Sequence, residues 1–329
     1  MSRLAPTMKA FFTDRLIRER NSSPNTIAAY RDTMRLLLRF ASEQLKVEPS
    51  RLEIGDLDAP LIGRFLDHLV QERGCSPRTR NQRLTSIRGL YRYAARRHPE
   101  HAAVIERVLA IPPKRHGKTL ITFLTSEETD ALIDAVDVST WTGRRDRAML
   151  MLAAQTGLRA SELVGLTIAD VHLGTGAHVN CIGKGRKQRI TPLTTTTTRM
   201  LRAWLSERGG HLGEPLFPTS QGRPLSRDAL EQRLAKHAAA ATEVCSSIRG
   251  KKVTPHVLRH TAAMRLLKAG IDTTVIALWL GHEQVETTQV YVHADLAIKE
   301  QAFARTAGVD GTPGRYRPAA PLLAFPQAL

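Results

Sequence analysis

Two adjacent prolines, Pro112 and Pro113, interrupt the chain within a basic segment at residues 111–118. A proline ring removes the helical N–H and clashes with the preceding turn, so no regular helix runs through this point. The chain has 329 residues, whereas single hydrophobic cores stop growing near roughly 250 residues. We therefore expect two folded domains, at residues 1–110 and 119–306, with a linker at 111–118 and a flexible tail at 307–329.

The charge of the chain indicates a polyanionic partner. There are 48 Lys and Arg against 31 Asp and Glu, which gives a formal net charge of +17. Such a surplus favours nucleic acid, because basic side chains that neutralise phosphates release condensed counterions. A basic surface without a ligand is the alternative that composition alone leaves open.

The cysteines and the N-terminus indicate the compartment. Cys75, Cys181 and Cys245 are scattered and lack CxxC spacing, which indicates neither a disulfide framework nor a zinc module. The N-terminus lacks the apolar core of a signal peptide, and no apolar run approaches the ~18 residues of a membrane span. We expect reduced thiols in a cytoplasmic protein with no membrane partner.

The first domain is predicted to be helical, with helices at residues 8–19, 24–40 and 77–95. The last two begin with Ser-Pro, in which serine is a cap and proline occupies a first-turn position that needs no N–H. Their outer faces are rich in arginine, and we expect these side chains to contact DNA phosphates, although a solvated helix face is the simpler alternative. The arginines are Arg31, Arg35 and Arg39 on one helix and Arg78, Arg80, Arg83, Arg88, Arg92, Arg96 and Arg97 on and just after the other.

The second domain is predicted to combine helices with one β-hairpin. Residues 177–193 change to strand periodicity around Gly183–Lys184–Gly185, which predicts a hairpin with a glycine-bounded turn. Gly157 is expected to end a helix at 147–156. Other helices are predicted at 126–136, 194–208, 226–241, 256–269 and 272–280. The fold class is therefore mainly α with a small β-sheet.

A set of basic residues precedes Tyr291 in the second domain. A phenol has a pKa near ~10, and moving it to neutral pH takes about 4 kcal/mol of electrostatic help. Arginines at positions 159 and 259 are suited both to that task and to binding the non-bridging oxygens of a phosphodiester, because the guanidinium fork contacts two oxygens and keeps its charge.

Each residue also has an ordinary structural explanation. Arg159 has an ion-pair partner at helical spacing in Glu162, Lys184 is a hairpin-tip lysine, and Tyr291 between two valines resembles a core aromatic. His256 and His260 lack the intervening glutamate of an HExxH zinc site, and the glycines around Lys184 lack the spacing of a phosphate-binding loop.

The order of these segments carries a family resemblance. The segments are TGLRASEL around Arg159, GKGRKQR around Lys184, HVLRH from His256 to His260, LGH ending at His282, and finally Tyr291. This series resembles the catalytic pattern of the tyrosine recombinases, the lambda-integrase and Xer-type family, over residues 119–306. The first domain is similar, more weakly, to the SAM-like core-binding domain of that family, so the resemblance implies this domain followed by an α+β catalytic domain.

The resemblance implies a role for each matching residue. Tyr291 is the nucleophile that forms a 3′-phosphotyrosyl bond, and Arg159 and Arg259 hold the non-bridging oxygens. Lys184 is the general acid for the departing 5′ oxygen. The remaining assignments are His256 in proton movement at the nucleophile, His282 in a hydrogen bond to the phosphate, and Glu162 in orienting Arg159.

The activity implied is that of a site-specific DNA recombinase or integrase, for which a transposon or a phage is the candidate carrier. Such an enzyme binds double-stranded DNA and works through a Holliday junction, as a homotetramer on two duplexes or as a hetero-oligomer with related recombinases. It needs no metal and no nucleotide cofactor. The alternatives are a type IB-like topoisomerase and a DNA-binding regulator without catalytic activity.

Overall fold

The structure is a computed structural model that describes residues 3–115, 117, 121–183, 188–281, 288 and 291. The chain divides into two compact units, residues 1–119 and 120–329. Each unit has its own hydrophobic core, and each is described separately below.

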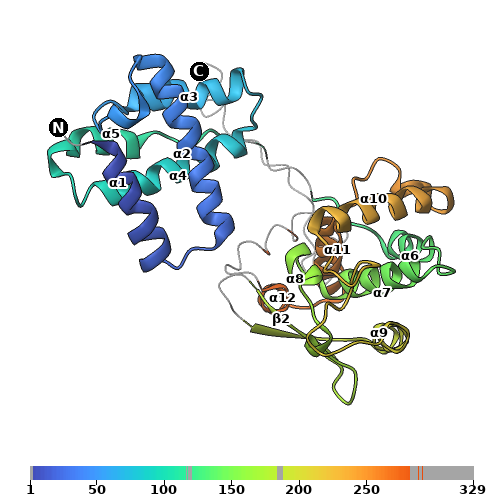
Figure 1. Ribbon diagram of the computed structural model, residues 1–329. Helices are drawn as coiled ribbons and strands as arrows, with labels where there is room; N and C mark the ends of the chain where they lie inside the picture. The colour runs from blue at the N-terminus through green and yellow to red at the C-terminus, as the bar shows by residue number, and fades with distance from the viewer. Residues whose placement is uncertain are drawn as a thin grey trace, which may run out of the picture. The chain divides into compact units, whose positions relative to one another are not determined.

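The N-terminal unit consists of helices (Figure 1). In chain order they are α1 (Leu4–Ala10), the π-helical segment η1 (Phe11–Glu19), α2 (Pro24–Leu45), η2 (Pro49–Arg51), α3 (Ala59–Gln71), α4 (Pro77–Ala94), η3 (Pro99–His101) and α5 (Ala102–Ala110). Helices α2 and α4 start at the two Ser-Pro pairs, and the Ser23 and Ser76 hydroxyls each accept a hydrogen bond from the backbone N–H three residues later, at 3.2 Å. Helix α2 runs five residues beyond the predicted end at 40, and α3 and α5 are additional to the predicted helices.

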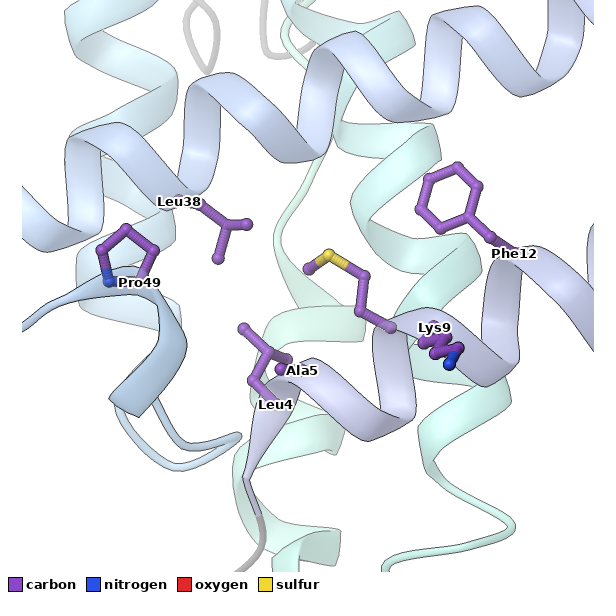
Figure 2. A pocket seen from close by; sticks show the side chains of 7 residues that line it. Leu4, Ala5, Lys9, Phe12, Leu38 and Pro49 are labelled. Carbon is purple, nitrogen blue, oxygen red and sulfur yellow. The ribbon is translucent and has the colours of Figure 1, made fainter.

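An apolar groove lies on the surface of this unit between α1, α2 and Pro49 (Figure 2). Leu4, Phe12 and Leu38 point toward it, and its volume is about 290 Å³. The core beneath is formed by side chains of all the long helices, including Phe11, Phe40, Phe65, Leu84 and Val108.

The start of the predicted linker is held against α4. The Asn81 side chain makes two hydrogen bonds with the Lys114 backbone, at 2.8 and 2.9 Å. Arg80 donates to the Pro112 carbonyl at 3.0 Å, and Arg88 donates to the Ile111 carbonyl. Two of the arginines expected to contact DNA phosphates therefore also bind the backbone of residues 111 and 112. Arg78, Arg92, Arg96 and Arg97, and all three arginines of α2, are exposed.

In the C-terminal unit, helix α7 packs against α6, α9 and α11 (Figure 1). The helices of this unit are α6 (Ser126–Asp134), α7 (Trp141–Thr156), α8 (Ala160–Val164), η4 (Ile168–Asp170), α9 (Thr195–Arg208), α10 (Arg227–Val244), η6 (Ser246–Ile248), α11 (Pro255–Lys268) and α12 (Thr273–Leu280). The strands β1 (Val171–His172), β2 (His178–Ile182) and β3 (Gln188–Pro192) form an antiparallel sheet in that order. The predicted mainly helical fold with a small sheet is confirmed, although α7 begins six residues before the predicted start at 147.

The hairpin lies where the sequence predicts it. In β2 and β3, Cys181 pairs with Arg189 and Val179 with Thr191, and all four side chains belong to the less exposed face of the sheet. The turn residues 184–187 lie outside the described residues.

Candidate active site

Arg159 is placed by the end of α7. Gly157 terminates this helix with a φ of +64°, a conformation that a residue with a Cβ rarely adopts. Arg159 is then the N-cap of α8 and has extended backbone angles. The reversal at Gly157 thus presents an arginine two residues after a buried helix, with its side chain 30% exposed.

The carboxylate of Glu162 joins two arginines. One oxygen accepts from Arg159 Nη1 at 2.8 Å and the other from the Arg159 backbone N–H at 2.8 Å. Arg189 on β3 donates to both oxygens, at 3.0 and 2.6 Å. Burial alone would raise the pKa of the Glu162 carboxyl, but the hydrogen bonds from Arg189 and Arg159 outweigh burial and lower this pKa to about 2. Glu162 is therefore ionised at neutral pH.

Arg259 is fixed by two backbone carbonyls. It is 3% exposed on α11 and donates to the Gly157 carbonyl and the Leu280 carbonyl, both at 2.7 Å. Burial, together with the positive charge of Arg159, lowers the pKa of its guanidinium to about 10. The group stays charged at neutral pH, so two cations repel each other here, and an anion between them would relieve that repulsion.

Tyr291 lies beside the arginines in a small apolar cluster with Ala263, Met264 and Leu280. The side chain is 2% exposed, and its hydroxyl is 3.0 Å from His260 Nδ1. Burial raises the pKa of the phenol, and the nearby charges of Arg259 and Arg159 only partly oppose this effect. The arginines are thus close enough to act on the phenol, but they do not lower its pKa below the ordinary value.

His256 and His260 lie one turn apart on α11, with ring centroids 4.2 Å apart. Burial, together with the charges of His256 and Arg259, lowers the pKa of His260 to about 4, so the His260 ring is neutral at pH 7. His260 Nδ1 lies within hydrogen-bond distance of the tyrosine hydroxyl, and His256 is exposed on the same helix face.

Four of the six candidate site residues belong to the described residues, and the structure brings them into one region: Arg159, His256, Arg259 and Tyr291. Lys184 and His282 lie outside the described residues. Two further residues of this region have no role in the sequence pattern: Arg189, and Gly281, whose carbonyl accepts from Arg159 Nη2 at 2.8 Å. The alternation of inward residues along β3 is the signal that identifies Arg189 as a buried arginine.

The described ranges contain no group of three or more His, Cys, Asp or Glu side chains arranged to hold a metal ion. None of the helices in those ranges has the length and apolar character needed to cross a bilayer.

Comparisons with known proteins identify the family. A profile described as "Phage integrase family" matches residues 122–297, and one for the phage integrase N-terminal SAM-like domain matches residues 10–98. The chain belongs to the phage integrase family of tyrosine recombinases. A putative integrase/recombinase of Sinorhizobium fredii, y4rC, is 53% identical to this recombinase over 327 residues, which are 99% of this chain and 98% of the relative. The tyrosine recombinase XerD of Pseudomonas aeruginosa is 35% identical over 312 residues, 93% of this chain and 98% of XerD.

Solved structures share the fold of this recombinase. XerH, a site-specific recombinase captured with its palindromic difH substrate after cleavage, superposes with a TM-score of 0.70 at 24% identity, covering 87% of this chain and 81% of XerH. The Tn1549 transposon integrase in complex with a circular intermediate DNA superposes with a TM-score of 0.67 at 17% identity, covering 90% and 98%.

The family membership decides the class of activity. This recombinase is an enzyme that breaks and rejoins DNA strands at specific sites. Neither alternative drawn from the sequence, a topoisomerase or an inactive regulator, gains support from these relatives.

Proposed function

We propose that Tyr291 is the nucleophile of strand cleavage and that Arg159 and Arg259 bind the scissile phosphate. The tyrosine oxygen attacks phosphorus, the bond to the 5′ oxygen breaks, and the products are a 3′-phosphotyrosyl bond and a 5′-hydroxyl. The observation that carries this assignment is that the charges of two guanidinium groups, Arg159 and Arg259, act on one buried tyrosine, with Arg159 oriented by Glu162. Negative charge that grows on the non-bridging oxygens is stabilised by these fixed cations.

The proton transfers belong to the same proposal. Because burial raises the pKa of the Tyr291 phenol, its proton leaves during attack rather than before it. We assign this transfer to the histidines of α11, with His256 as the residue that the family pattern indicates. Lys184 protonates the departing 5′ oxygen, and His282 donates a hydrogen bond to the phosphate. No step requires a metal ion or a nucleotide cofactor, because the phosphotyrosyl bond conserves the energy for rejoining.

We further propose that the two units divide the work as a DNA-binding domain and a catalytic domain joined at residues 111–118. The exposed arginines of α2 and α4 support DNA binding by the first domain. Strand exchange requires four cleavages, so we propose a tetramer on two duplexes, of identical chains or with a related recombinase, that passes through a Holliday junction. The DNA substrate and the three free thiols favour the cytoplasm.

A nicked suicide substrate tests the nucleophile. Cleavage releases a short fragment, so the covalent adduct accumulates. We expect the wild-type chain to form the adduct and Tyr291→Phe to form none, while both bind DNA with the same affinity, because the hydroxyl is needed only after binding. An adduct on the Phe variant would assign the nucleophile to another tyrosine and reject the proposal.

A two-duplex assay tests the reaction class. Products that join strands of the two duplexes are expected for a recombinase. Relaxation of supercoiled DNA without such products would instead indicate a topoisomerase.

A further inference from the structure

The buried arginine of β3, Arg189, is not needed to explain the fold of the hairpin. Its side chain is 10% exposed, and both terminal nitrogens donate to the Glu162 carboxylate. The two residues are 27 positions apart and belong to different elements. A bidentate arginine–carboxylate pair fixes the position and the plane of both groups. Apolar contacts could stabilise the hairpin without the free energy needed to remove two charges from water.

The charges explain what the second arginine does for the first. With Arg159 and Glu162 alone, the pair would have no net charge, and the carboxylate would neutralise the residue that has to bind a phosphate. With Arg189 included, the three side chains carry one net positive charge. Glu162 can therefore orient Arg159 through two hydrogen bonds while the cluster keeps a positive charge for an anionic ligand.

Gly281 supports the same arrangement from the opposite side. Its carbonyl accepts from Arg159 Nη2 at 2.8 Å. A Cβ at this position would lie 2.9 Å from Arg189 Nη1, so the glycine backbone packs directly against Arg189. The Arg159 guanidinium is thus held on one edge by Glu162 and on the other by Gly281, and Arg189 contacts both of these residues.

We infer that Arg189 is a positioning residue for DNA cleavage, which holds Glu162 and Gly281 so that Arg159 is presented to the scissile phosphate with its charge available. This inference rests on the proposed function of Arg159. Arg189 itself touches no reacting atom in this assignment, so its effect is expected in the rate of cleavage and not in the affinity for DNA.

Single-turnover cleavage of the suicide substrate tests the inference in Arg189→Gln, Arg189→Lys, Glu162→Gln and the double variant Arg189→Gln/Glu162→Gln. We expect Arg189→Gln to reduce the rate on the order of tenfold to a hundredfold, as for a misplaced catalytic group, with unchanged DNA affinity. Arg189→Lys should recover part of the rate, because it restores the charge but not the bidentate geometry. The double variant should be no slower than the slower single variant, because both changes act through one interaction.

A matched control is Arg144→Gln. Arg144 also forms a bidentate pair with a glutamate, Glu207, but on the exposed surface of the same unit, and its replacement should leave the rate unchanged.

A substrate with a neutral methylphosphonate at the scissile position separates positioning from folding. This substrate lacks the charge that Arg159 binds, so the difference between wild type and Arg189→Gln should shrink, as it should for Arg159→Ala. An equal defect on both substrates, or additive losses in the double variant, would assign Arg189 a purely structural role and overturn the inference. Absence of any adduct with the wild-type chain would instead reject the proposed function, so the two failures are distinguishable.

Discussion

Gly157 meets three requirements at a single residue. Its φ of +64° ends α7, its carbonyl accepts from Arg259, and a Cβ would lie 2.7 Å from Leu280 Cδ2 and 3.0 Å from Ala262 Cβ. Gly157→Ala should therefore lower the free energy of unfolding by about 2 kcal/mol or more, from left-handed strain together with overpacking. Urea titration measures this loss. Gly174→Ala is the control, because that site has open space and no positive φ, and an equal loss in both variants would contradict the explanation.

Lys184 and Lys187 compete for the role of general acid. The glycines on both sides of Lys184 give it the freer backbone, which favours it as the residue delivered to the 5′ oxygen. Lys184→Ala should slow cleavage by roughly a hundredfold or more, and Lys187→Ala should mainly weaken DNA binding. A bridging 5′ sulfur leaves without protonation, so it should restore cleavage to the Lys184 variant and not to Arg159→Ala. Rescue of the Lys187 variant would transfer the role to Lys187.

At the scale of elements, α2 and α4 carry arginines of two kinds. Arg80 and Arg88 bind the backbone carbonyls of residues 112 and 111, whereas Arg35 on α2 and Arg92 on α4 are exposed. Replacing Arg35 and Arg92 together by Ala should weaken DNA binding and reduce the slope of log affinity against log salt by up to about two, since each phosphate contact contributes ~0.9. The Arg144→Ala variant, tested at the same salt concentrations, should change the slope less because Glu207 already pairs with that arginine. An unchanged slope in the double variant would indicate that these arginines lie on a solvated helix face and do not contact phosphates.

The anchoring of residues 111–114 makes α4 a support for the chain that follows α5, in addition to its proposed role in DNA binding. Asn81 and Arg80 make their contacts from the first turns of α4. The sequence predicts this helix from its cap and periodicity, but the partners of its side chains depend on where the chain after α5 passes.

At the scale of the whole chain, buried carboxylates make the C-terminal unit sensitive to acid. Burial raises the pKa of Glu162, Asp146 and Glu128, and in each case hydrogen bonds from cationic and other donors outweigh burial and lower the pKa. A depressed folded-state pKa contributes stability that is present above the unfolded pKa and is lost as pH falls through the folded value.

For Glu162 the window runs from the ordinary value of 4.5 down to about 2. This shift corresponds to a contribution on the order of 3 kcal/mol. As the pH is lowered through this window, we expect the urea concentration at the midpoint of unfolding of the C-terminal unit to fall. In Glu162→Gln this midpoint should fall less steeply. Tryptophan fluorescence reports this unit selectively, because the chain has three tryptophans, Trp141, Trp204 and Trp279, all beyond residue 119. Identical pH dependence in both proteins would show that Glu162 does not titrate in this window.

The sequence by itself determined the local secondary-structure elements and the candidate residues of the site. Capping serines before prolines, Gly157 after an apolar helix and the change of periodicity at the hairpin each depend on neighbouring residues, so they are readable along the chain. Arg159, Arg259 and Tyr291 were identifiable as candidates because their segments occur in an order that resembles the tyrosine recombinase pattern.

Only the tertiary structure decided how these side chains are held. The pairing of Arg189 with Glu162 spans 27 residues and the contact of His260 with Tyr291 spans 31. Such contacts depend on how β3, α8 and α11 pack, and no local spacing encodes that packing. The burial of Tyr291 also depends on this packing. Burial raises the pKa of its phenol, although the nearby arginines act in the opposite direction.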